Sequence, residues 1–136
     1  DTIYKYTDTG EKTIWAQSSD FSNAVSMAID MSIYVLSSTG EVFKYTSGTQ
    51  DAFELKDMDV PLNAPTKIVI GPKSDALYIA DNGNKSVAVV DMEGNFKQRI
   101  YHKDKETWND IKDISISPED DELFVLNGTS VYEVSL

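Results

Sequence analysis

Side chains able to do acid–base or nucleophilic chemistry are few and scattered in this sequence. His102 is the single histidine and stands among charged residues at 103–106. Because a general base needs a buried, oriented imidazole, we expect His102 to be a solvated loop residue. There is no cysteine, which removes thiol nucleophiles, disulfides and zinc–thiolate sites. No Gly-x-Ser-x-Gly elbow or phosphate-binding glycine loop occurs, so we predict no catalytic residues.

Carboxylate and amide oxygens could instead bind a hard cation such as Ca²⁺. Asp81, Asn82 and Asn84 are closely spaced but lack the closing Glu of an EF-hand loop, and hydrogen bonds within their own turn explain them better. Asp30 and Asp113 adjoin strands that we expect to line a central channel, but they do not occupy equivalent repeat positions. We therefore expect no cofactor and no metal ligands, with Ca²⁺ bound by such carboxylates as the alternative.

The composition excludes several kinds of partner. Twenty-three acidic residues against twelve basic ones give a formal charge of −11, whereas nucleic-acid affinity depends on Lys and Arg displacing counterions. Anionic membrane surfaces are disfavoured for the same reason. No apolar run approaches the ~20 residues of a membrane-spanning helix, and no signal-peptide pattern opens the sequence. The lack of cysteine suits the cytoplasm and a bacterial extracytoplasmic compartment equally.

The elements that position these residues form an internal repeat. Each unit has a short apolar first run, an almost wholly apolar second run and an alternating third run, at a period of roughly 45 residues. A more polar fourth run closes two of the units. The first runs are 27–30, 68–71 and 114–117; the second are 33–36, 77–80 and 123–126; the third are 41–45, 86–90 and 130–134; the fourth are 52–55 and 96–100.

Gly- and Asn-rich turns separate these runs, and such residues tolerate the positive φ of tight hairpins. Four short strands per unit is the pattern of a β-propeller blade, so the sequence predicts an all-β fold of four-stranded antiparallel blades. The blades are expected at 24–56 and 64–101. Residues 1–17 supply the last two strands of a further blade, and 110–136 supply three strands of another. The charged stretch 102–109 is expected to be a loop between blades.

A closed propeller needs about four to eight blades, so the sequence predicts a partial ring. Either the chain is a fragment of a longer protein, or copies associate to complete a ring. In the second case another copy's N-terminus could supply the fourth strand after Leu136 by strand addition.

The run Leu77-Tyr78-Ile79-Ala80-Asp81-Asn82-Gly83-Asn84, with Ser86 to Asp91 and Gly94, resembles an NHL repeat. Lys85 stands near the family's His-Arg pair, and Ser86 departs from it. The match covers 64–101, while the other units keep only the skeleton. This resemblance implies a six-bladed type of propeller that binds proteins, peptides, glycans or small ligands on one face. The alternative that it implies is a Ca²⁺-dependent lactonase or hydrolase with an acidic central channel.

The leading functional hypothesis is a non-catalytic binding or scaffold module. Its recognition face would consist of the longest connections between blades, 18–23, 57–65 and 102–110. The partner would be a protein, a peptide or another copy of the chain. Aromatic and apolar side chains are the usual anchors of such surfaces, which makes the candidates Phe21, Met58, Leu62 and Trp108. The alternative for Phe21 and Trp108 is that they fill the gaps between blades.

Overall fold

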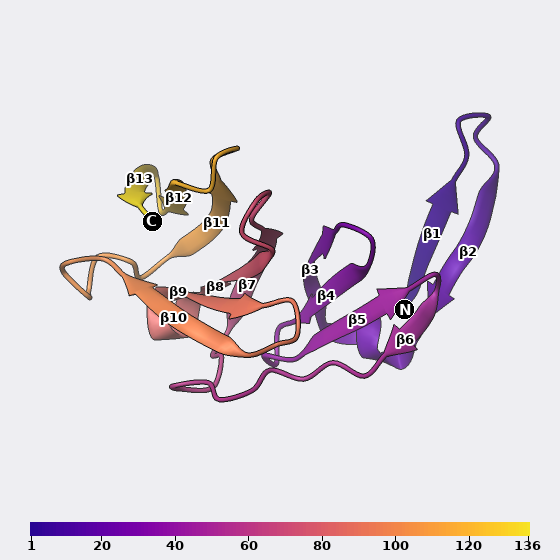
Figure 1. The fold of residues 1–136 in the computed structure, drawn as a ribbon, viewed down its shortest axis with the longest axis horizontal. Helices are drawn as coiled ribbons and strands as arrows, with labels where there is room; N and C mark the ends of the chain where they lie inside the picture. The colour runs from indigo at the N-terminus through magenta and orange to yellow at the C-terminus, as the bar shows by residue number, and fades with distance from the viewer.

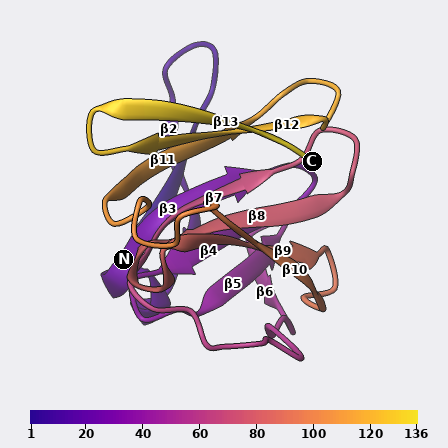
Figure 2. The ribbon, with the colours of Figure 1, turned by 90° about the vertical axis from the view of Figure 1, so that its left-hand side faces the viewer.

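A computed structural model describes all of residues 1–136 and confirms the all-β fold, with thirteen strands in four antiparallel sheets. The sheets are fanned next to one another in an open arc (Figure 1), and the view turned by 90° shows them stacked (Figure 2). The β1–β2 hairpin lies at one end of the arc and the sheet β11–β13 at the other. The arrangement is that of successive blades in part of a propeller.

The two central sheets have four strands each, in sequential order. The N-terminal hairpin comprises β1 (Thr2–Tyr6) and β2 (Lys12–Gln17), and a short 3-10 turn, η1 (Ser19–Asn23), follows it. Blade 2 comprises β3 (Ala24–Ile29), β4 (Ile33–Ser37), β5 (Val42–Thr46) and β6 (Thr49–Asp51). Blade 3 comprises β7 (Pro65–Ile70), β8 (Ala76–Asp81), β9 (Ser86–Asp91) and β10 (Phe96–Tyr101), with η2 (Asn82–Asn84) between β8 and β9. Blade 4 comprises β11 (Ile111–Ile116), β12 (Glu122–Asn127) and β13 (Ser130–Ser135).

One predicted strand is wrong. Residues 52–55 are irregular, and the fourth strand of blade 2 is β6, three residues nearer the turn. The two-residue turn Ser47–Gly48 starts β6 early, and the chain then leaves the sheet. It crosses to blade 3, where the Lys56 amide donates to the Gly94 carbonyl (2.8 Å) and the Phe96 amide donates to the Lys56 carbonyl (3.0 Å). The pairing of Lys56 with blade 3 thus takes the place of the predicted pairing of residues 52–55 within blade 2.

Every first strand carries a β-bulge at the same place, which the sequence did not indicate. The register shifts between Ala24 and Ser26 in β3, and at the matching positions of β7 and β11. A bulge adds one unpaired residue and bends the strand. The shared register makes three apolar positions equivalent and sets each opposite its second strand: Met27 opposite Val35, Ile68 opposite Ile79, and Ile114 opposite Val125.

The hydrophobic core lies between blades, so each sheet contributes a different set of side chains to each neighbour. Leu77 and Ile79 of β8 pack against blade 2, while Ala76, Tyr78 and Ala80 pack against blade 4. This explains why β8 is buried along its whole length, because both faces of the blade 3 sheet are covered. No helical segment is long and apolar enough to cross a membrane.

Candidate functional site

The loops predicted as a recognition face lie at one end of the sheets, together with the turns between second and third strands. A backbone hydrogen bond joins each such turn to a residue one or two positions before the first strand of its blade. The Ser38 amide donates to the Asn23 carbonyl (2.8 Å), the Gly83 amide to Asn63 (2.8 Å), and the Gly128 amide to Asp110 (2.9 Å). The repeated contact fixes all three connections in equivalent positions.

The four candidate anchors do not form one surface. Phe21 is half-buried in η1, with its ring 5.1 Å from that of Tyr45. Met58 and Leu62 are half-buried on the connection from blade 2 to blade 3 and pack on the core between those blades. Trp108 lies at the far side of blade 3, in the core between blades 3 and 4.

Trp108 is not exposed: its relative exposure is 0%. Its ring is 6.5 Å from that of Tyr132 and 6.0 Å from that of His102. The interpretation of Trp108 as an exposed anchor therefore does not fit the structure, and the gap-filling alternative does. His102 is likewise half-buried rather than fully solvated, since its ring packs edge-on against Tyr132 at 5.3 Å and its Nδ1 accepts the Asp104 amide at 3.0 Å.

A buried ion pair holds the connection that carries Met58 and Leu62. The Arg99 side chain is 2% exposed and its Nη1 lies 2.6 Å from Asp81 Oδ2, in a carboxylate with no exposure. Arg99 Nε also contacts Asp59 Oδ1 (3.0 Å), and Nη2 donates to the Val60 carbonyl (3.0 Å). The one arginine of the sequence thus ties the fourth strand of blade 3 to the chain entering that blade.

The Asp81 and Asn84 side chains serve the same connection. Asp81 Oδ1 accepts the Asn63 amide (2.9 Å), and Asn84 Nδ2 donates both to Asp81 Oδ2 (2.7 Å) and to the Pro61 carbonyl (2.9 Å). In blade 4 the equivalent residue, Asn127, accepts the Asp110 amide in the same way (2.8 Å). A buried polar residue at the end of the second strand therefore anchors the incoming loop in both blades. The role of Arg99 in holding this loop could not be identified from the sequence.

The carboxylates considered for a cation are apart from one another. Asp113 pairs with Lys67 at 3.1 Å, and Asp30 accepts the Ser32 amide at 2.7 Å. No cluster of three or more His, Asp or Glu residues has metal-binding geometry.

A cavity of about 300 Å³ beside Asp30 also includes Tyr34 and Lys44. Burial raises the pKa of Tyr34 above its ordinary value, and Lys44 partly offsets this rise.

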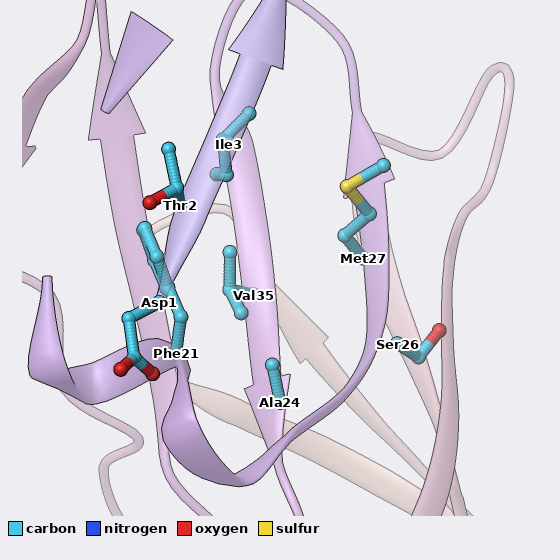
Figure 3. Close-up of a pocket in the computed structure, with 8 residues that line it drawn as sticks. All are labelled: Asp1, Thr2, Ile3, Phe21, Ala24, Ser26, Met27 and Val35. Carbon is cyan, nitrogen blue, oxygen red and sulfur yellow. The ribbon is translucent and has the colours of Figure 1, made fainter. Parts of the chain in front are cut away.

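A cavity of about 300 Å³ opens between the start of the N-terminal hairpin and β3. Figure 3 shows side chains from β1 on one side and Met27 and Ser26 of β3 on the other. We call the exposed surface of β3 formed by Val25, Met27 and Ile29 the open end face. Met27 is 54% exposed, whereas its equivalents in the next two blades, Ile68 and Ile114, are 1% and 3% exposed.

Two further cavities adjoin on the outer flank of blade 2, with volumes of about 390 and 280 Å³. We call them together the outer cleft. Both include Gly40, Glu41 and Leu55, and they lie between the start of β5 and the irregular segment that leaves β6. The second cavity includes both Met58 and Leu62, so the structure brings together these two predicted candidates.

No protein-family model matches the sequence, and no curated protein matches it. Solved structures do match. Virginiamycin B lyase from Staphylococcus aureus is 13% identical, with a TM-score of 0.67 over 99% of this chain and 48% of that chain. A 6-phosphogluconolactonase-like protein from Bacteroides uniformis is 11% identical, with a TM-score of 0.72 over 99% and 47%. A chain of a nidogen–laminin complex is 15% identical, with a TM-score of 0.63 over 85% and 43%.

At these identities the likeness establishes the fold alone, which is that of β-propeller blades. The chain spans about half the length of the structures it matches. These structures include a lyase and a lactonase-like protein as well as a protein complex, so they do not select a function.

Proposed function

We propose that this chain is a non-catalytic binding module: a partial ring of NHL-like propeller blades whose open end face binds further blades. The observation that carries the proposal is the exposure of Met27 at a position that is buried in both following blades. Apolar faces of a repeat unit are stabilised by the neighbouring unit, and uncovered faces of this kind are typical interaction sites.

The occupant that we propose is a second copy of the chain. The sheet of blade 4 has three strands and the N-terminal hairpin has two. We take the three as the first to third strands of a blade, and β1 and β2 as a third and a fourth strand. If the β11–β13 sheet of one copy joins β2 of the other, each junction makes one whole blade, and two copies close a ring of six. Strand β2 must then pair with β13 of the other copy instead of with β1, because β1 and β13 both correspond to the third strand of a blade.

A charge on the open end face tests this proposal. In Met27→Glu the ionised carboxylate would have to be buried on association, which is costly without a partner group. The matched control is Met31→Glu, since Met31 is 92% exposed in a loop outside the face. We expect sedimentation velocity to show self-association in the unmodified chain and in Met31→Glu, and monomers in Met27→Glu. Equal association of both variants would overturn the assignment of the face.

The alternative is a Ca²⁺-dependent lactonase or hydrolase whose channel is completed by further blades. It predicts that millimolar Ca²⁺ raises the melting temperature and that Asp113→Ala removes this increase. An unchanged melting temperature would count against it.

A further inference from the structure

The start of strand β5 has an unpaired outer edge within the outer cleft. β5 pairs with β6 at only three positions, Thr46 with Thr49, Tyr45 with Gln50, and Lys44 with Asp51. The intervening turn has two residues, both with positive φ: 51° at Ser47 and 83° at Gly48. In a hairpin of this kind the closing pair exchanges both hydrogen bonds, and bonded pairs alternate along the ladder. Residues 46, 44 and 42 therefore direct their amides and carbonyls outward.

The inner side of the same strand agrees with this alternation. The Ser37 amide donates to the Glu41 carbonyl at 2.8 Å, so the odd-numbered residues of this stretch bond toward β4. The main-chain amide and carbonyl of Val42 then point outward, away from β4. On a full-length fourth strand, the residue that pairs with Val42 would be Phe53. Phe53 has left the sheet and packs its ring against Tyr34 at 5.6 Å.

Blade 3 shows the pairing that blade 2 lacks. Val87 occupies the position equivalent to Val42, since Val87 lies opposite Ala80 as Val42 lies opposite Leu36. In blade 3 the fourth strand continues to this level, and Val87 pairs with Ile100. Blade 2 thus lacks the three pairs equivalent to those at Ser86, Val87 and Ala88. The outer cleft lies beside Glu41, Val42 and Phe43, which have no partner in β6.

The lining of the outer cleft indicates the chemistry of a strand that would fit there. Apolar contact is offered by Val42, Phe43 and Leu55, while Glu41 and Glu54 are exposed acidic groups at the cleft. Neither of the two cavities includes a lysine or arginine. Complementary charges favour encounter and register at such surfaces, so the matching segment carries basic residues between apolar ones.

We propose that the outer cleft binds an extended, basic segment of a partner protein by strand addition. The segment exchanges main-chain hydrogen bonds with Val42, places apolar side chains in the cleft and sets basic side chains beside Glu41 and Glu54. This inference rests on the proposed function as a binding module and specifies the class of one partner. It uses a surface other than the open end face.

A suitable probe is the end-blocked hexapeptide Phe-Lys-Gln-Arg-Ile-Tyr, the sequence of β10, because that strand fills this position in blade 3. Two controls match it: the same peptide with the isoleucine amide N-methylated, and one with glutamates replacing the lysine and arginine. In amide-resolved NMR titrations of the full chain we expect the largest shifts at residues 40–43 and 53–55. Because each control lacks either the main-chain donor or the charge, we expect binding about tenfold weaker or more.

The protein-side test neutralises the two acidic groups in the double variant Glu41→Gln/Glu54→Gln. The matched control is Glu11→Gln/Glu133→Gln, which changes two exposed glutamates remote from the cleft. We expect about tenfold weaker binding of the basic peptide in the first variant and unchanged binding in the second. Equal binding of all three peptides, shifts centred elsewhere or no binding at millimolar peptide would overturn the inference.

The two proposals fail separately. Loss of self-association in Met27→Glu with peptide binding intact supports both surfaces as independent sites. Self-association without peptide binding overturns the outer cleft and leaves the proposed function standing, whereas peptide binding by a chain that never associates overturns only the ring-completing role.

Discussion

Removing the buried guanidinium in Arg99→Met should destabilise the fold far more than removing an exposed cation. Arg99 is 2% exposed and pairs with Asp81, which has no exposure. Breaking one side of a buried ion pair leaves an uncompensated charge and costs about 3–5 kcal/mol. Asp81 keeps the Asn63 amide and the Asn84 side-chain amide as donors, so we expect the lower end, about 3 kcal/mol.

The assay is urea unfolding followed by tryptophan fluorescence. With a denaturant slope of about 2 kcal/mol per molar urea, a loss of about 3 kcal/mol lowers the midpoint by about 1.5 M. The control is Lys67→Met, since Lys67 pairs with Asp113 at 3.1 Å but is 36% exposed. Exposed pairs contribute about 1 kcal/mol or less.

The reasoning fails if Arg99→Met and Lys67→Met shift the midpoint equally. A second variant sharpens the test: Asp81→Leu added to Arg99→Met removes the orphaned carboxylate and should restore part of the lost stability. Failure of any recovery would mean that the hydrogen bond that Asp81 accepts from the connecting loop, rather than the charge pair, carries the stabilisation.

Three further predictions concern packing, backbone and pH. Trp108→Ala should lower the free energy of unfolding by about 3–5 kcal/mol, measured by urea unfolding, because the indole is wholly buried between blades. Gly94→Ala should lower the melting temperature more than Gly10→Ala, because both have similar positive φ but only at Gly94 would a Cβ collide with a carbonyl of the preceding blade. The pKa of Asp91 is lowered from 3.8, chiefly by Lys97, so the carboxylate stabilises the fold above about pH 4 and loses this effect as the pH falls further. Asp91→Asn should therefore flatten the acid decline of the melting temperature, and an unchanged decline would refute the assignment.

The strands could be predicted from sequence because their signals are local. Nearly continuous apolar runs mark β8 and β9, a more polar run marks β10, and Gly- or Asn-containing turns separate them within one blade. The error at 52–55 has a non-local cause. Those residues alternate as a strand should, but the turn at Ser47–Gly48 and the pairing of Lys56 with blade 3 take the chain elsewhere.

The sequence also could not predict which side chains are buried between blades. Met27 and Ile68 are both apolar and occupy equivalent positions, yet one is exposed and the other buried, because only the second faces a complete neighbouring sheet. Trp108 and Phe21 both follow the same kind of strand, and nothing local distinguishes the wholly buried indole from the half-buried phenyl ring. Likewise the partners of Arg99 come from two separate segments, the connection at Asp59 and Val60 and the end of β8 at Asp81, so no spacing in the sequence indicates them.

The solution mass across a wide concentration range, measured by light scattering, tests the central claim most directly. If the open end face is covered by a second copy, the mass rises to about twice the 15.2 kDa of the chain and stays there on further concentration, because a closed ring leaves no free end. A mass of one chain at every concentration would contradict ring completion by self-association.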